Sequence, residues 1–149
     1  MQLSKNFSLS EFTRSDTAQR LGIDNTLVST EQLLNLAYLC HMVLQPLRDC
    51  FGPIRITSGL RCPKLNKAVG GVENSQHMLG EAADIYLPTK EMGVQYLKFL
   101  QTLAAVDQLI WEQSASGTCW IHVSSRRLDK NRRQEIATQQ KSFNNKNNT

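Results

Sequence analysis

Apolar residues recur at helical spacing in two segments of the chain. In residues 30–50 they stand mostly three or four positions apart, and Ser29 and Gln32 form a capping-box pattern at the start of the segment. Residues 90–104 show a second apolar face with the same period. We therefore predict two long helices. Their apolar faces comprise Leu33, Leu36, Ala37, Cys40, Leu44 and Leu47 in the first, and Met92, Tyr96, Leu97, Phe99, Leu100 and Leu103 in the second.

Short segments of β-type composition predict strands between and after these helices. The segments are 54–57, 82–87, 106–112, 120–125 and, at the edge of a sheet, 132–139. A turn rich in Ser and Gly joins the third segment to the fourth, as in a hairpin. Two long helices with a run of strands predict an α+β fold, in which helices pack on one side of an antiparallel sheet of four to five strands.

The remaining segments predict shorter elements. Residues 1–29 suit an extended lead followed by short helical pieces, and Pro63 suits the first turn of a short helix that ends near Val69. The N-terminal apolar residues expected to anchor this lead on the core are Leu9, Phe12, Leu21 and Ile23.

Length and composition indicate one globular domain. The chain has 149 residues, 40% of them hydrophobic and 20% charged, which is enough to bury a sizeable core. We expect a single domain over residues 1–140 and a disordered tail over 141–149, which is rich in Asn and Lys. No apolar run suits a membrane span or a secretory signal, so we expect a protein that is cytoplasmic as synthesised, with no membrane partner.

The net charge of +4 comes largely from the C-terminal end. Such an end either attracts a polyanion or forms a solvated basic surface, and we favour the second interpretation because no aromatic residues alternate with the charges. We therefore expect no nucleic-acid partner. The basic residues are Arg126, Arg127, Lys130, Arg132, Arg133, Lys141 and Lys146.

The four cysteines contain no Cys-x-x-Cys pair, which argues against a structural zinc finger. Without a secretory context there is no reason to expect disulfides, so we interpret Cys40, Cys50, Cys62 and Cys119 as reduced and mostly packed.

Three residues form a candidate metal site. His77 precedes Asp84 by seven positions, and His122 lies in the last strand of the predicted hairpin. Two imidazoles and one carboxylate are a ligand set of catalytic zinc, whose fourth position stays open for water. Small residues between the first two ligands suit a backbone that passes close to a metal and a substrate: Gly80, Ala82 and Ala83. His41 lies beside the apolar face of the first long helix, so we interpret it as structural or exposed.

A hydrolytic zinc site also needs a general base, and Glu112 is the best candidate. If the hairpin pairs residues whose numbers sum to an even value, Glu112 and His122 share one face of the sheet. An odd register would separate the two. Glu81 is the competitor, but its strand parity differs from that of Asp84, which would direct it away from the metal.

Two further residues suit substrate binding. Arg61 follows a strand through a Ser-Gly turn, where a guanidinium could bind a carboxylate in a two-pronged way. Ser75 stands two residues before His77 and could bind the substrate backbone or orient the loop. Both also suit ordinary turn positions.

Together these motifs resemble the zinc D-Ala-D-Ala carboxypeptidase family, which includes D,D-dipeptidases and phage endolysins that cut L-Ala-D-Glu bonds. The resemblance extends from about Asn6 to Val123. The motifs that carry it are Ser58-Gly59-Leu60-Arg61 with Asn66, Val69-Gly70-Gly71, Ser75-x-His77-x-x-Gly80-x-Ala82-x-Asp84, and Trp120-Ile121-His122-Val123.

The resemblance implies the α+β fold shared with the hedgehog signalling domain and one zinc ion bound by His77, Asp84 and His122. It also implies that Arg61 holds the substrate carboxylate or the developing oxyanion and that Ser75 contacts substrate. Many members carry an acidic base three residues before the last histidine or a histidine two before it. Here those positions are Cys119 and Trp120, so we assign the base to Glu112.

The resulting hypothesis is a monomeric zinc peptidase that hydrolyses peptide bonds of the peptidoglycan stem peptide, either as a carboxypeptidase or as an endolysin-type endopeptidase. A phage or prophage enzyme that reaches the wall after release or delivery fits the lack of a signal. The alternative is a non-catalytic, zinc-containing module that binds peptidoglycan or serves a phage structure. A nucleic-acid-binding domain is a third reading and depends on the C-terminal charges alone.

Overall fold

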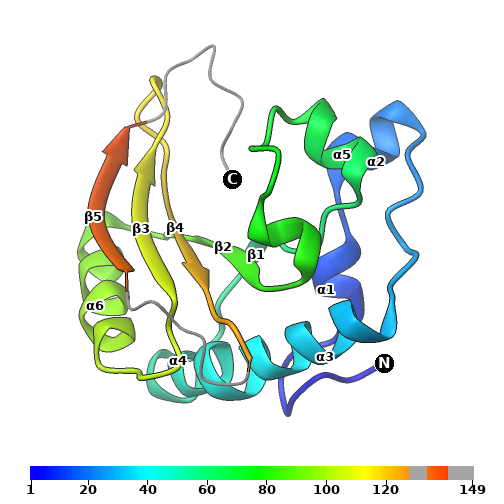
Figure 1. Ribbon diagram of the computed structural model, residues 1–149. Helices are drawn as coiled ribbons and strands as arrows, with labels where there is room; N and C mark the ends of the chain where they lie inside the picture. The colour runs from blue at the N-terminus through cyan, green and yellow to red at the C-terminus, as the bar shows by residue number, and fades with distance from the viewer. Residues whose placement is uncertain (128–133, 141–149) are drawn as a thin grey trace.

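The computed structural model describes residues 1–127 and 134–140 (Figure 1). Its helices are α1 (Leu9–Thr13), α2 (Asp16–Leu21), α3 (Thr30–Leu39), the π-helical turn η1 (Cys40–Leu44), α4 (Gln45–Phe51), α5 (Pro63–Ala68), the 3₁₀ turn η2 (Gln76–Leu79) and α6 (Lys90–Gln101). Its strands are β1 (Ile56–Ser58), β2 (Ala82–Tyr86), β3 (Gln108–Gln113), β4 (Cys119–Ser124) and β5 (Gln134–Gln140).

The strands form one sheet in the order β1-β2-β4-β3-β5. The pairs β1–β2, β2–β4 and β4–β3 are antiparallel, which confirms the α+β prediction. β5 differs because it pairs in parallel with β3. β4 ends beside the start of β3, where Val123 pairs with Leu109, and β5 begins at that same end, where Gln134 pairs with Gln108. The chain therefore runs along β5 in the direction of β3.

The predicted helix over 30–50 is continuous but changes geometry in its middle. α3 passes into the π turn η1 and then into α4, where Pro46 stands in the first turn. Inside an α-helix a proline lacks its N–H and collides with the carbonyl four residues earlier, so a wider turn relieves the clash. Ser29 and Gln32 form the predicted capping box at the start.

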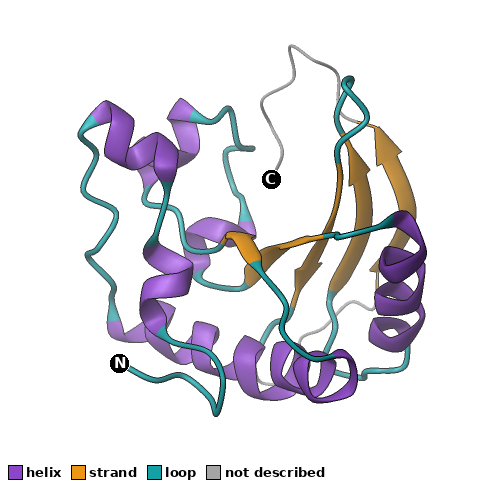
Figure 2. Cartoon of the chain, turned by 180° about the vertical axis from the view of Figure 1, so that it is seen from behind, coloured by secondary structure: helices purple, strands orange, loops and turns teal. Residues whose placement is uncertain are grey.

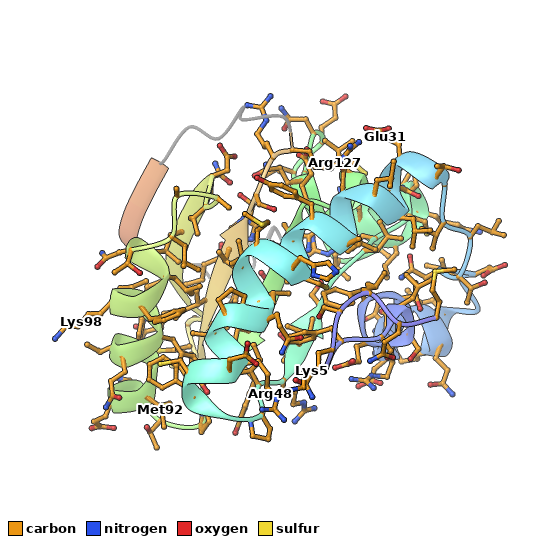
Figure 3. The ribbon with its side chains drawn as sticks, turned by 90° about the horizontal axis from the view of Figure 1, so that it is seen from below. Lys5, Glu31, Arg48, Met92, Lys98 and Arg127 are labelled. Carbon is orange, nitrogen blue, oxygen red and sulfur yellow. The ribbon has the colours of Figure 1, made fainter. Side chains whose placement is uncertain are left out.

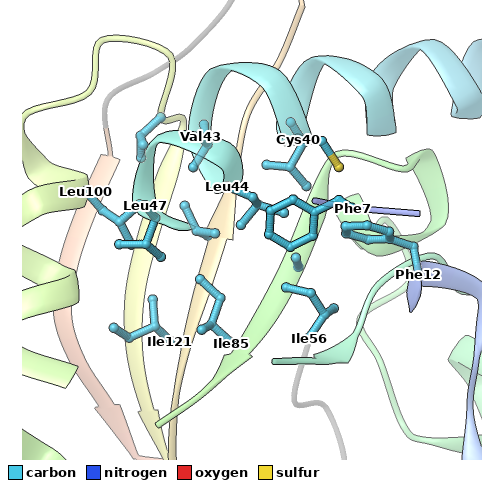
Figure 4. Packing of buried hydrophobic residues seen from close by; sticks show 14 of the residues in the cluster. Phe7, Phe12, Cys40, Val43, Leu44, Leu47, Ile56, Ile85, Leu100 and Ile121 are labelled. Carbon is cyan, nitrogen blue, oxygen red and sulfur yellow. The ribbon is translucent and has the colours of Figure 1, made fainter. Parts of the chain in front are cut away.

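One face of the sheet packs on the helices. Figure 4 shows Ile85 and Ile121 of the sheet against Leu47 of α4 and Leu100 of α6, all fully buried. Viewed from behind, α6 lies alongside the sheet, and it contacts β3 and β4 (Figure 2). Alternation along β4 therefore assigns Ile121 and Val123 to the core and leaves Trp120 and His122 on the opposite face.

The N-terminal segment joins this core through aromatic residues. Phe12 is fully buried, and Leu9 packs against the core from a partly exposed position. The expected anchor Leu21 is wrong, since 52% of its surface is exposed. Leu21 ends α2, where Gly22 at φ +67° turns the chain.

The C-terminal predictions are covered only in part. Arg127 donates to Asn35 Oδ1 over 2.7 Å and pairs with Glu31 of α3 (Figure 3), so this cation is held on the helix. Residues 128–133 and the expected tail 141–149 lie outside the described residues. All four cysteines are free, as predicted; Cys40 is buried and Cys62 and Cys119 are half-buried, whereas Cys50 is exposed. Within the described part of the chain, no helix is long and apolar enough to cross a membrane.

Candidate metal centre

His77, Asp84 and His122 meet on the sheet face opposite the helices. Asp84 of β2 and His122 of β4 are directly paired across the two strands, and η2 brings His77 over them. Asp84 Oδ1 lies 3.3 Å from His77 Nε2 and 3.3 Å from His122 Nδ1. One donor atom from each residue lies within 4.8 Å of the others, and all three residues are buried. The cluster can therefore hold a metal ion.

The backbone fixes the orientation of the His77 ring. His77 Nδ1 lies 2.7 Å from the carbonyl oxygen of Gly59. A carbonyl only accepts hydrogen bonds, so Nδ1 carries the proton and Nε2 keeps a lone pair directed at Asp84. Within the part of the chain that the structure describes, this buried Nε2 has no hydrogen-bond partner. A histidine that donates its other N–H to a carbonyl is the usual arrangement of a metal ligand.

The surroundings favour the protonation states that bind a metal: a neutral imidazole for His77 and a carboxylate for Asp84. Burial lowers the pKa of His77 to about 4, which keeps the imidazole neutral at pH 7. Burial raises the pKa of Asp84, but the charge that His77 carries once protonated and the hydrogen bond from His122 outweigh this effect and lower it to about 2. The site thus offers a neutral imidazole and a carboxylate without first losing protons to water.

Helix α3 holds the turn that carries His77. Gln32 and Asn35 donate side-chain hydrogen bonds to the carbonyls of Met78 and Leu79, over 2.9 and 2.8 Å. Gly80 ends the turn at φ +75°, and a Cβ there would lie 2.6 Å from the carbonyl oxygen of Gln32. The small residue at position 80 thus serves contact with α3. The expected clearance for a metal and substrate stays a prediction.

Glu112 lies on the same sheet face as the cluster. β3 and β4 pair Ile110 with His122 and Glu112 with Trp120, which is the even register. Glu112 and His122 are therefore diagonal neighbours, whose Cα atoms stand roughly 7–8 Å apart in a sheet. Glu112 is fully buried. The residues expected on the opposite, helix-covered face are Leu109, Trp111, Ile121 and Val123, and all belong to or pack against the core.

Arg61 reaches the cluster from the turn after β1. Its Nη2 lies 3.6 Å from Asp84 Oδ2, while Nε donates to Ser58 Oγ over 3.1 Å and Nη1 to Asn66 Oδ1 over 3.2 Å. Burial lowers the pKa of Arg61, and the charges of Asp84 and Glu112 act in the opposite direction. The guanidinium therefore forms an ion pair with Asp84, and it also interacts electrostatically with Glu112.

Gly71 leaves space for the Asn66 side chain that binds Arg61. A Cβ at Gly71 would lie 2.0 Å from Asn66 Oδ1, the atom that accepts from Arg61. Asn66 also donates to the carbonyl of Val72 over 2.8 Å. The Val69-Gly70-Gly71 motif thus leaves room for the amide that orients Arg61.

The two remaining candidates take supporting positions. Ser75 is buried and its hydroxyl accepts from the His77 N–H over 3.2 Å, the loop-orienting contact anticipated for it. Glu81 accepts from Gln76, which also donates to Asp107, and Glu81 does not join the cluster of possible ligands among the described residues.

Sequence reasoning missed two supports of this centre. The first is the carbonyl of Gly59, a backbone atom for which a side-chain pattern gives no signal. The second is Asn25, whose side chain bonds to the backbone on both sides of Arg61. A polar residue that stays buried within an otherwise open loop is a signal visible only in the structure.

A buried His–Asp–His cluster on an α+β sheet, with a carboxylate and an arginine beside it, is an arrangement that metal-dependent hydrolases use. Comparison with family models gives the specific assignment, because the model described as Peptidase M15 matches residues 5–124. The chain belongs to this family of zinc-dependent peptidases, as its motifs indicated. A search of curated proteins found no match.

Proposed function

We propose that the protein is a zinc peptidase that cleaves peptide bonds in bacterial peptidoglycan. The observation that carries the proposal is the His77 ring, whose proton is held on Nδ1 by Gly59 so that Nε2 faces Asp84 beside His122. Such a geometry suits a ligand and costs an apo protein a buried, unsatisfied nitrogen.

His77, Asp84 and His122 would hold the ion, with further coordination open to water and substrate. A bound zinc ion supplies a Lewis acid that polarises the scissile carbonyl and lowers the pKa of water. The donor chemistry fits, since two nitrogens and one carboxylate oxygen match a preference of zinc.

Glu112 is the proposed general base. It takes the proton of the attacking water and passes it to the leaving amine. Its burial and its place diagonal to His122 support this role, because proton transfer requires the carboxylate on the face where the carbonyl binds. Arg61 places positive charge beside Asp84, where it stabilises the oxyanion that develops on the substrate. Ser75 as a substrate contact stays a prediction beside its contact with His77.

The substrate is proposed from the family resemblance. Peptidase M15 implies a peptide substrate, and the motif around His77 resembles enzymes that cut the peptidoglycan stem peptide. We further propose a monomeric enzyme of the carboxypeptidase or endolysin type, of phage or prophage origin, which reaches the wall after release or delivery.

Digestion of purified peptidoglycan tests this function. The wild-type protein should release new amino termini from stem peptides, and mass spectra of the fragments identify the bond. A chelator should abolish the release and added zinc should restore it. Intact stem peptides after prolonged incubation with the zinc-loaded protein would contradict the proposal and favour the non-catalytic, peptidoglycan-binding alternative.

A further inference from the structure

One turn connects both sides of the candidate metal centre. Residues 58–62 supply the Gly59 carbonyl that fixes the His77 ring and the Arg61 side chain that contacts Asp84. The Arg61 N–H also donates to the His77 carbonyl over 3.0 Å. A displacement of this turn would therefore move the ring of one ligand and the ion-pair partner of another.

The side chain of Asn25 binds this turn on both sides of Arg61. Its Nδ2 donates to the carbonyl of Leu60 over 2.9 Å, and its Oδ1 accepts from the N–H of Cys62 over 2.8 Å. Nδ2 also donates to the carbonyl of Thr13 over 2.9 Å, at the end of α1. Both N–H groups of the amide and its oxygen are thus engaged.

The location of Asn25 makes these bonds exceptional for a loop residue. It is 5% exposed, whereas its neighbours in residues 22–29 are exposed or half-buried. The turn it holds lies 35 or more residues further along the chain. A second contact supports the same turn from α1, because Leu60 N–H donates to the Phe12 carbonyl over 2.7 Å.

We infer that Asn25 is a positioning residue of the metal centre, which acts through residues 58–62 to set the His77 ring and the Arg61 guanidinium. The inference rests on the proposed zinc site but goes beyond it, since Asn25 contacts none of the three ligands in the hydrogen bonds described. The N-terminal segment thereby supports the metal centre through residues 58–62, without contacting the three ligands itself.

Gln45 offers a matched control. It is also a buried amide that holds the N-terminal segment, through Ser4 and Asn6, and it donates to Asp49 on its own helix α4, away from the cluster. Its replacement removes comparable hydrogen bonds. Generic loosening of the segment should therefore affect Asn25→Ala and Gln45→Ala alike, whereas positioning should separate them.

The experiment measures zinc affinity by competition with a chromophoric chelator, together with urea unfolding. Asn25→Ala should bind the zinc ion about tenfold to 100-fold more weakly, the usual effect of losing support behind a ligand. Gln45→Ala should lose stability but keep its zinc affinity. Asn25→Ser, whose shorter side chain can keep at most part of these hydrogen bonds, should fall between wild type and Asn25→Ala. This variant also tests the inference if the alanine variant does not fold.

Two results would overturn the inference. One is a zinc affinity in Asn25→Ala equal to that of wild type, and the other is an equal loss in Gln45→Ala. If the wild-type protein itself binds no zinc, the proposed function fails, and the inference is then tested in the metal-free protein. Amide hydrogen exchange at Arg61 and the ¹⁵N shift of His77 Nδ1 should change in Asn25→Ala and not in Gln45→Ala. Unchanged values in both variants would contradict it.

Discussion

The ring of His77 donates its Nδ1 proton to the carbonyl of Gly59 across 2.7 Å. This contact joins residues 18 positions apart and decides which nitrogen faces Asp84. It prepares His77 for the ligand role proposed above, because a ring held in this way need neither rotate nor change tautomer before a metal binds.

Glu112→Gln should remove most turnover and leave zinc bound. The amide cannot accept the proton of the attacking water, so we expect kcat to fall by about 10²- to 10⁴-fold, the usual contribution of a general base. Elemental analysis and peptide-release kinetics measure the two effects. Glu91→Gln on the exposed first turn of α6 is the control and should behave as wild type. Loss of zinc from Glu112→Gln would instead assign Glu112 to the ligands or to the structure.

Gly80→Ala should destabilise the protein more than Gly22→Ala does. Both glycines have positive φ, at +75° and +67°, so both variants incur backbone strain of about 1–2 kcal/mol. A Cβ at Gly22 meets nothing within 4 Å, whereas one at Gly80 meets the Gln32 carbonyl at 2.6 Å. This overpacking should add about 1–3 kcal/mol and displace η2 with its ligand His77.

Urea unfolding of the two glycine variants measures this difference, and chelator competition measures zinc affinity. We expect the affinity to fall in Gly80→Ala alone. Equal stability and equal zinc affinity in the two variants would show that the contact between η2 and α3 does not position the ligand.

Acid should destabilise the metal-free protein from about pH 6.5 downward. The pKa of His77 is about 4 in the folded chain and 6.5 without the fold, so the unfolded state takes up the proton first as pH falls. Stability is therefore complete above pH 6.5 and declines toward pH 4 by about 1.4 kcal/mol per pH unit. Asp84, with a pKa of about 2 against 3.8, adds a loss below pH 3.8.

Urea unfolding at several pH values tests this dependence. His77→Gln should lose the part of the slope between pH 6.5 and 4, because glutamine does not titrate. His41→Gln, at an exposed position, should keep it. A metal-free wild-type protein whose stability stays constant from pH 6.5 to 4 would show that His77 is not held neutral by burial.

The spacing of apolar residues was sufficient to predict the long helices, the strands, and the face of the sheet that carries the site. Alternation along residues 108–124 separates Ile121 and Val123 from His122 and Glu112, because side chains in a strand point to opposite faces. The histidines and Asp84 were identified because motif spacing reports ligand chemistry. Their meeting point follows from the pairing of Asp84 with His122.

Features that depend on distant backbone atoms could not be predicted in this way. The Gly59 carbonyl and the Asn25 bonds join segments with no shared periodicity. The parallel course of β5 depends on where β4 ends, and the exposure of Leu21 depends on the direction of α2. The contact of Gly80 with Gln32 of α3 likewise joins distant segments and gives no local signal.

The metal content of the purified protein tests the central claim most directly. Elemental analysis should find about one zinc ion per wild-type chain and about one in His41→Ala, whose exposed imidazole lies on η1 outside the cluster. His77→Ala should contain almost none. A wild-type protein without zinc after reconstitution at neutral pH, or a His77→Ala protein that retains it, would contradict the assignment of His77, Asp84 and His122 as a zinc centre.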